Sequence, residues 1–232
     1  MKDIFVLQIE TATPVCAVAV SKNGKTVGKI DADEPNLHAS HLTVFIDQLL
    51  VEAGIAMEDL DAVAVSMGPG SYTGLRIGVS TAKGLCYGMN IPLIAINTLD
   101  AMLAGFKEQL PELVMGNVLV PMIDARRMEV YLAKYDDAGV KIRDTEACII
   151  DADFFGQYSN QQRFVLFGSG ADKFETLFAE DPQVEVISHF ANSADFLSGL
   201  AYEKYRSEQF VDLVYFEPFY LKDFIATTPK KR

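Results

Sequence analysis

The stretch from Met67 to Leu85, MGPGSYTGLRIGVSTAKGL, constrains the fold most strongly. It follows DAVAVS, a short and almost wholly apolar run, which predicts a strand that is covered on both faces. The residues after the first glycines have the composition of a helix of about four turns. A strand, a glycine-rich turn and a helix together form a common anion site, because the first amides of the helix lack partners within it. The same glycines could instead serve close packing.

Two familiar phosphate-binding motifs do not fit this stretch. A Walker A loop needs a lysine and a hydroxyl residue after its second glycine, but Leu75 and Arg76 follow Gly74. A dinucleotide-binding loop needs a third glycine where Thr73 stands. A phosphate contact through Gly68, Gly70 and Ser71 is still one hypothesis. The alternative, of equal weight, is a turn that needs glycine for its backbone angles and ends in a helix cap.

Small residues recur every four positions along the predicted helix, at Gly74, Gly78, Ala82 and Cys86. This spacing places them in one row on the helix surface. Each glycine inside a helix costs roughly 0.8–1 kcal/mol relative to alanine, so two in one row indicate a packing requirement. The neighbour is either another helix of this chain, most simply His38–Ala53, or a helix of another subunit. The sequence weighs these two equally.

The rest of the chain predicts two similar halves. Strand-like runs around residues 4–10, 15–21 and 25–33, with an Asn23-Gly24 hairpin, precede the first helix. The second half repeats strands and a hairpin. In it we predict a short helix that starts at Asp151, a second helix over residues 173–180 and a third over residues 192–210. We therefore expect two duplicated α/β subdomains, residues 1–110 and 111–232, divided at the polar connection around Pro111.

Bulk properties exclude several classes of function. The formal net charge of −12 repels phosphate backbones, so direct non-specific binding to nucleic acid is not expected. Cys16, Cys86 and Cys148 stand far apart among apolar residues, as reduced thiols do. No apolar run approaches the roughly 18 residues of a membrane span. We expect a cytoplasmic protein with no membrane contact and no cleaved leader.

Few residues have the pattern of a catalytic site. The histidines are His38, His41 and His189, and no third metal ligand lies near the first two, so a capping or solvated pair is favoured. HExxH, CxxC and GxSxG motifs are absent. Two segments remain as candidate nucleotide contacts, although an ion-paired corner is the favoured interpretation of the first. They contribute Asp124 and Arg126 from IDARRMEVY, and Gly168 and Gly170 from FGSGA.

Taken together, these segments closely resemble the TsaB family, also called YeaZ. The resemblance covers nearly the whole chain and is carried by LQIETATPVCAVAV, HASHLTVFIDQLL, the glycine-rich stretch, IDARRMEVY and EPFYLK. It implies the α/β fold of actin, sugar kinases and Hsp70, with two duplicated subdomains that each hold a mixed five-stranded sheet. It also implies a non-catalytic activating subunit that pairs with TsaD. TsaD transfers threonylcarbamoyl to adenosine 37 of tRNAs that read codons starting with A.

The family further implies the partners. These are TsaD in a heterodimer, the ATPase TsaE, a second copy of this chain, and tRNA only through the assembly. Following the row of small residues, we predict a helical interface with TsaD, and we expect Gly78→Leu to abolish it while the monomer stays folded. The predicted interface consists of Leu42, Phe45, Ile46, Leu49, Gly74, Arg76, Gly78 and Ala82.

The resemblance predicts no cofactor and no metal for the chain by itself. The histidine pair that binds metal in TsaD corresponds here to Thr98 and Met102, neither of which suits such a metal. Relatives that bind ATP carry an Asp-Gly-Thr-like loop where this chain has Glu10, Thr11, Ala12 and Thr13. We therefore expect ATP or ADP only in the assembled complex, with Thr11 as a further candidate phosphate contact. The alternative function is a small-molecule kinase or ATPase of this fold, and a metallopeptidase is remote.

Overall fold

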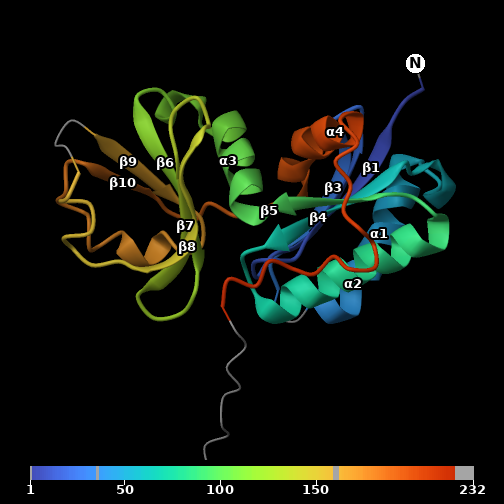
Figure 1. Ribbon diagram of the computed structural model, residues 1–232, viewed down its shortest axis with the longest axis horizontal. Helices are drawn as coiled ribbons and strands as arrows, with labels where there is room; N and C mark the ends of the chain where they lie inside the picture. The colour runs from blue at the N-terminus through green and yellow to red at the C-terminus, as the bar shows by residue number, and fades with distance from the viewer. Residues whose placement is uncertain (1, 35–36, 159–161, 223–232) are drawn as a thin grey trace, which may run out of the picture.

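Two five-stranded sheets lie side by side in the computed structural model, which describes residues 2–34, 37–158 and 162–222 (Figure 1). The first sheet has the order β3-β2-β1-β4-β5. Its antiparallel part is joined at the Asn23-Gly24 turn, where both residues have positive φ as this hairpin requires. In the parallel part, β1 pairs with β4 and β4 pairs with β5. Its strands are β1 (Phe5–Glu10), β2 (Cys16–Lys22), β3 (Lys25–Ala32), β4 (Ala62–Gly68) and β5 (Leu93–Asn97).

The second sheet repeats this topology. Its order is β10-β9-β6-β7-β8, so β6 takes the central place that β1 has in the first sheet. β6 pairs antiparallel with β7 and parallel with β9, as β1 does with β2 and β4. The duplicated actin-like architecture is therefore confirmed. The strands are β6 (Asn117–Asp124), β7 (Glu129–Tyr135), β8 (Lys141–Ile149), β9 (Arg163–Phe167) and β10 (Val184–Ile187).

Helices cover both faces of the first sheet. α1 (Leu37–Ala53) and α2 (Tyr72–Met89) lie on one face, and α3 (Thr98–Gln109) and α4 (Ser198–Arg206) lie on the other (Figure 1). The buried strands supply apolar side chains to both sides, since Leu7 packs with α1 and α2 while Val6 packs with α3 and α4. Short 3₁₀ turns are η1 (Met57–Asp59), η2 (Pro111–Leu113), η3 (Asp172–Phe174) and η4 (Ala194–Leu197).

The second half differs from the sequence prediction in four places. Residues 173–180 form the end of η3 and then turns, and turns replace the helix expected after Asp151. The last helix starts later than predicted, at Ser198, and ends at Arg206. Strand β10 was not predicted at all. In each case the apolar residues reach the core from compact turns or a four-residue strand, which are too short to show a periodicity.

A single division between residues 110 and 111 is also wrong. The sheets do follow it, but η4 and α4 pack against the first sheet, where Leu197 and Ala201 share one core with Val6. Residues 207–222, here called the C-terminal strap, then run along the first subdomain. The amide of Val211 donates to the carbonyl of Leu93 (3.0 Å), so the strap covers the edge of β5. Burial of apolar side chains against the first sheet thus places η4 and α4 in the first subdomain, although both follow the second sheet in the sequence.

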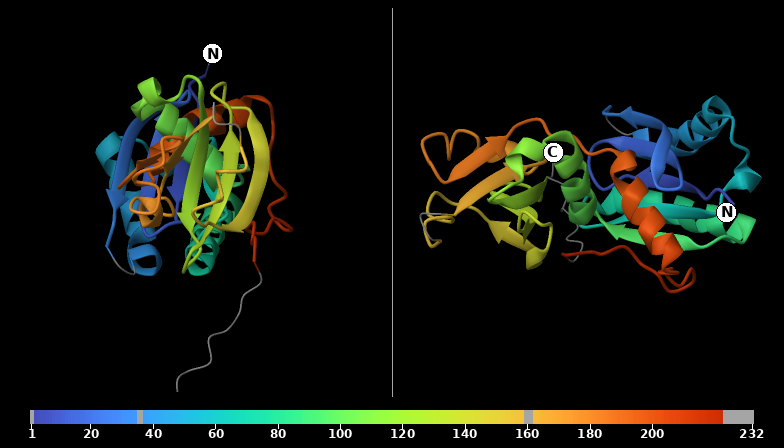
Figure 2. Two further views of the ribbon diagram at one scale, coloured as in Figure 1. Left: turned by 90° about the vertical axis from the view of Figure 1, so that its left-hand side faces the viewer. Right: turned by 90° about the horizontal axis from the view of Figure 1, so that it is seen from above.

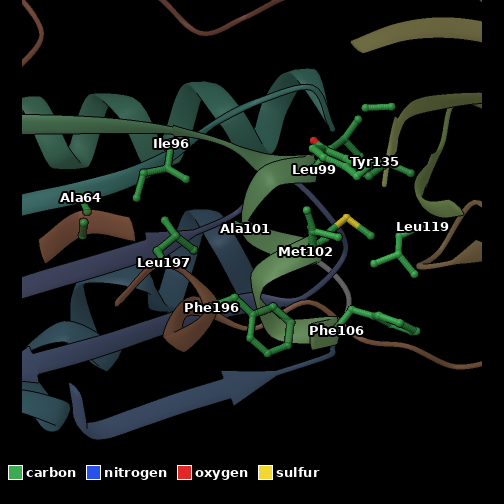
Figure 3. Close-up of a cluster of buried hydrophobic side chains, with 14 of the residues drawn as sticks. Ala64, Ile96, Leu99, Ala101, Met102, Phe106, Leu119, Tyr135, Phe196 and Leu197 are labelled. Atoms are coloured by element: carbon green, nitrogen blue, oxygen red, sulfur yellow. The ribbon is translucent and has the colours of Figure 1, made fainter. Parts of the chain in front are cut away.

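The central core joins the two subdomains through α3, which lies between the sheets (Figures 2 and 3). Met102 and Phe106 of this helix contact the cluster that includes Leu119 of β6 and Phe196 of η4. The rings of Phe106 and Phe167 stack with centroids 4.0 Å apart. Within the described ranges, no helix combines the length and apolar character needed to cross a membrane.

Candidate functional site

The glycine-rich loop is seated on another part of the same chain. After β4, the loop turns into α2, whose N-cap is Ser71; its hydroxyl accepts from the amide of Gly74 (3.3 Å). The amide of Ser71 donates to the carbonyl of Ala12 (2.7 Å), in the loop between β1 and β2. The hydroxyl of Thr11 donates to the carbonyl of Gly74 (2.9 Å). The β1–β2 loop therefore lies directly on the start of α2.

Glycine is required here because no side chain fits. A Cβ atom at Gly70 would overlap the carbonyl of Ala12, and Cβ atoms at Gly74 and Gly78 would overlap the carbonyl and the hydroxyl of Thr11. Gly74 and Gly78, the first two members of the row of small residues, therefore pack against a loop of their own subdomain. For the two glycines the neighbour is thus neither of those expected from the sequence, whereas Ala82 and Cys86 share a buried cluster with Leu42 and Ile46 of α1, the helix of this chain that was predicted. Gly78→Leu would clash inside the monomer and does not test an interface.

The same contacts fill the position at which the sequence predicted a bound phosphate. The donors of Thr11 and Ser71 are used within the chain, and Gly70 lies against Ala12. A Cβ at Gly68 would lie 2.7 Å from the carbonyl of Phe219 in the C-terminal strap, so this glycine too allows a neighbouring segment to pack closely. A phosphate contact of these residues stays a prediction, and it requires the β1–β2 loop to move.

The second candidate phosphate segment lies at the carboxyl ends of β6 and β9. Asp124 accepts from the ammonium of Lys173 (2.6 Å) and from the backbone amide of Arg126 (2.6 Å), so its ion pair is with a distant lysine and not with an arginine of its own segment, as the favoured interpretation had it. Gly168 and Gly170 pack closely on β6, where a Cβ at either would overlap its backbone. The structure thus brings Asp124 and Arg126 together with this glycine turn.

Two features of this corner escaped the sequence analysis. Arg126 and Arg127 are both exposed and have φ values of 73° and 53°, a left-handed conformation that costs a non-glycine residue of order 1–3 kcal/mol. Lys173 also donates to the carbonyls of Arg127 (2.7 Å) and Glu129 (2.8 Å), so it holds the turn in place. A lysine far along the chain gives no signal of this role in the sequence.

Glu10 lies at the end of β1, where relatives that bind ATP carry their acidic phosphate loop. Its side chain is 1% exposed and accepts from the amide of Ala12 (2.6 Å). Ser66 of β4 and Asn192, in the connection from β10 to η4, also hydrogen-bond to it. Burial raises the pKa of Glu10 to about 7, because a charged carboxylate is poorly solvated there. Enclosed in this way, Glu10 links the first sheet to the connection from β10 to η4.

The positions that correspond to the metal ligands of TsaD are core residues. Thr98 is buried at the start of α3 and its hydroxyl is hydrogen-bonded to that of Ser66 (2.8 Å). Met102 lies in the central core (Figure 3). His38 donates to the carbonyls of Thr13 (3.0 Å) and Val15 (3.2 Å) and so fixes the β1–β2 loop. In the described part of the chain, no three or more His, Cys, Asp or Glu side chains form a group that could hold a metal ion.

The predicted interface residues divide into a buried and an exposed set. Phe45 is half-buried, and Arg76 is exposed with its guanidinium 5.5 Å from the ring centroid of Tyr72. The remaining members pack inside the chain and offer no surface to a partner, which corrects the prediction for them. These are Leu42, Ile46, Leu49, Gly74, Gly78 and Ala82.

A different part of the same helix pair faces solvent. Val44 and Val51 of α1 are 53% and 74% exposed, and Tyr87 of α2 is 83% exposed. Gly84 and Gly88 stand in a second row on α2, where an added Cβ would meet nothing within 4 Å. We call these exposed residues of α1 and α2, which are Val44, Val51, Gly84, Tyr87 and Gly88, the outer helix face. It combines exposed apolar side chains with a low helix surface, which are properties of protein interaction sites.

Comparison with known proteins gives consistent matches. The family model described as TsaD, tRNA N6-adenosine threonylcarbamoyltransferase, matches residues 34–228. The tRNA threonylcarbamoyladenosine biosynthesis protein TsaB of Escherichia coli is 28% identical over 95% of this chain and 96% of its own length. TsaB of Haemophilus influenzae is 35% identical, but that alignment covers 58% of this chain and only 55% of the relative.

Solved structures share the fold. YeaZ from Pseudomonas aeruginosa superposes with a TM-score of 0.76 at 24% identity, covering 94% of this chain and 100% of that one. The activator of 2-hydroxyisocaproyl-CoA dehydratase from Clostridium difficile has a TM-score of 0.52 at 10% identity, covering 90% and 97%. With the duplicated sheets, the glycine seat of α2 and the family match over most of its length, this chain belongs to the TsaB (YeaZ) family.

Proposed function

We propose that this chain is an activating subunit, without catalytic groups of its own, in the biosynthesis of threonylcarbamoyladenosine in tRNA. Its membership of the TsaB family and the name of the E. coli relative support the pathway. The arrangement of Glu10, Thr98 and Met102 supports a non-catalytic role, because all three are buried in hydrogen bonds or core contacts. The transfer to adenosine 37 of tRNAs that read codons starting with A belongs, in this proposal, to TsaD.

The observation that carries the proposal is the outer helix face. The TsaD family model matches residues 34–228 of this chain, which include α1 and α2, so TsaD is expected to carry a comparable helix pair. Two related helix pairs can pack face to face about a pseudo-twofold axis, as in isologous dimers. Gly84 and Gly88 would let the helices approach closely. TsaD is thus the proposed occupant, and a second copy of this chain occupies the face when TsaD is absent.

The remaining partners follow from the same arrangement. TsaE is expected to dock on the pair of TsaB-type chain and TsaD, and tRNA to be reached through the assembly, since the net charge of −12 disfavours direct contact. ATP or ADP is a proposed ligand only of the assembled complex. The exposed turn at Arg126, with Asp124 and the glycines at 168 and 170 below it, is the proposed phosphate contact.

The test compares two matched glycine substitutions. Gly84→Arg places a bulky charge on the outer helix face, and Gly199→Arg does the same on α4; both glycines are helical, exposed and without neighbours within 4 Å. We expect Gly84→Arg to weaken binding to TsaD of the same organism at least about a hundredfold, as loss of a central interface contact does. Gly199→Arg should bind like the parent chain.

Formation of modified tRNA is measured in parallel, in a reconstitution with TsaC, TsaD and TsaE. Product should require this chain and should be lost with Gly84→Arg but not with Gly199→Arg. Equal product without the chain would contradict the proposed function. Equal TsaD affinity for both variants would contradict only the proposed interface. Tight binding of magnesium and ATP by the isolated chain would favour the alternative of a small-molecule kinase or ATPase.

A further inference from the structure

A cavity of about 590 Å³ lies between the two subdomains, and its lining includes no residue of the glycine-rich loop or of the outer helix face. β3 and the residues after it form one wall, through Lys29, Asp31 and Asp33. The end of α3 and the connection from β10 to η4, residues 187–193, form the other walls. Pockets for small molecules commonly have roughly 300–1,000 Å³ and lie between domains. Neither the family resemblance nor the proposed function assigns a role to this cavity.

The ammonium group of the cavity is already fully engaged. Lys29 donates to Asp195 (2.8 Å) and to Ser193 (3.3 Å), and it forms an ion pair with Asp31 (3.2 Å). A lysine has three N–H donors, so these contacts use all of them. An anionic ligand such as a phosphate would therefore have to displace a carboxylate or rely on His189, the other basic residue of the lining. The cavity does not offer an anion site.

Acceptor groups, in contrast, are in excess. Asp33 is exposed and makes no hydrogen bond or ion pair with any residue that the structure describes. Asp31 accepts from the hydroxyl of Ser193 at 2.7 and 2.9 Å and still has free lone pairs. The hydroxyl of Ser188, another lining residue, is buried without a partner. Carboxylates outnumber ammonium groups here, so the local field attracts positive charge.

The rest of the lining is apolar and includes aromatic rings. Phe190 and Phe196 stack with centroids 5.7 Å apart and contribute to the wall. Val15, Ala32, Leu110 and Ala191 extend this apolar surface. Such a wall favours the hydrophobic part of a ligand, because burying it releases water from both surfaces. A bare metal ion or a fully polar cation would leave this wall unused.

We propose that this cavity binds a small amphipathic organic cation, an amine or guanidinium attached to an aromatic or aliphatic body. The charged end lies against Asp31 and Asp33, and the apolar body lies on the side of Phe190 and Phe196. A ligand in this position contacts both subdomains. Since it binds the folded arrangement and not the unfolded chain, it also stabilises the protein, by an amount that grows with the logarithm of its concentration above the Kd.

Three probes of matched size test the charge preference: phenethylamine, phenethyl alcohol and phenylacetate. Each is titrated into the ¹⁵N-labelled full chain at low salt, and the shifts of the backbone amides are followed. Phenethylamine should shift the amides of residues 31–33 and 187–193 with saturation. Phenethyl alcohol should bind more weakly, and phenylacetate should not saturate.

Two carboxylate variants complete the test. Asp33→Asn should weaken phenethylamine binding at least about tenfold, the typical effect of losing one charge-assisted hydrogen bond. Because Asp33 has no partner among the described residues, this variant should fold normally, which the melting temperature verifies. Glu58→Gln, an exposed carboxylate of η1 outside the cavity, is the control and should leave the affinity unchanged. Saturable binding of phenylacetate equal to that of the amine, equal amine affinity in both variants, or no shift with the amine would each overturn the proposal.

Discussion

The two subdomains have the same strand order but cover their sheets differently. In the first, the connections from β3 to β4 and from β4 to β5 are α1 and α2, helices of 17 and 18 residues. In the described part of the second, the equivalent connections contain turns and the 3₁₀ turn η3. Aromatic rings close its outer face instead: Phe155 lies 4.6 Å from Phe164 and 5.3 Å from Phe178, measured between ring centroids.

The aromatic cluster also encloses a lysine. Lys134 of β7 is 2% exposed, donates to the hydroxyl of Tyr158 (2.5 Å), and has its ammonium 5.0 Å from the ring centroid of Phe154. Burial lowers the pKa of Lys134, because the charged form loses solvation. Cation–π contacts offset part of that cost. The second subdomain thus fills its outer layer with its own side chains and has no long helix pair to present to a partner.

This difference indicates which surface of the fold is open to a partner protein. A sheet needs some apolar cover on each face, but the cover can be a helix pair with an outer surface of its own or a closed cluster of rings. Of these two covers, the helix pair leaves an exposed face with open glycines, at Gly84 and Gly88. The proposed partner surface therefore lies on the first subdomain. Substitutions in the aromatic cluster, at Glu10 and on α2 test this difference between the two subdomains.

The largest expected effect is that of Phe155→Ala. Removing this fully buried ring should cost about 3–5 kcal/mol of unfolding free energy, because the turns around it cannot supply replacement contacts. Chemical denaturation measures the loss, and hydrogen exchange should show it first in β8 and β9. Phe210→Ala, at a position 40% exposed, is the control and should cost much less. Equal loss of protection in α1 and α2 would show that the aromatic cluster supports both subdomains.

The next effect concerns the junction and depends on pH. The pKa of Glu10 is about 7 in the folded chain and ordinarily 4.5, so the folded state holds this proton more tightly. Below pH 4.5 the group is protonated in both states and has no effect. As pH rises from 4.5 to 7, stability should fall by on the order of 3 kcal/mol at most, and then level off.

Glu10→Gln keeps an acceptor for the amide of Ala12 but cannot ionise. The variant should therefore lack this fall, while all other titrating groups cancel in the difference between variant and parent. Denaturation midpoints at pH 4.5, 6 and 8 measure it. Identical pH profiles would mean that Glu10 is solvated in solution and is not enclosed between the first sheet and the connection from β10 to η4.

The smallest effects are those of single methyl groups on α2. Gly74→Ala should destabilise by about 1–3 kcal/mol, since its Cβ would overlap the carbonyl of Thr11. Gly84→Ala, in open space on the same helix, should stabilise by up to about 1 kcal/mol through helix propensity. Thermal and chemical unfolding of both variants give the two signs. If both substitutions stabilise, the β1–β2 loop does not lie against α2 in solution.

Much of the first subdomain could be predicted from local sequence. The Asn23-Gly24 hairpin, the alternating strands and helices α1 to α3 fall close to their predicted positions because each is long or has a defined turn. The second subdomain was less predictable for the opposite reason. β10 has only four residues, and the rings of Phe174 and Phe178 reach the core from turns, so no periodicity marks them.

The candidate site divides in the same way. The row of glycines on α2 predicts a close approach from spacing and helix propensity alone, and the structure confirms that approach. The partner in it, Thr11, lies about sixty residues earlier, and nothing local to α2 indicates it. The contacts of Lys173 with the Arg126 turn and the cavity at Asp31 likewise depend on residues that are distant in sequence.

The sequence by itself determined the family, the duplicated architecture and the need for close packing along α2, because these follow from motifs and residue spacings along the chain. The tertiary structure alone decided what approaches those glycines, which side of α1 and α2 stays exposed, and that the C-terminal strap returns to the first subdomain. It also decided that Glu10 is enclosed and has a raised pKa. These properties arise from contacts between distant segments, where burial and excluded volume act on residues whose neighbours are set only by the complete fold.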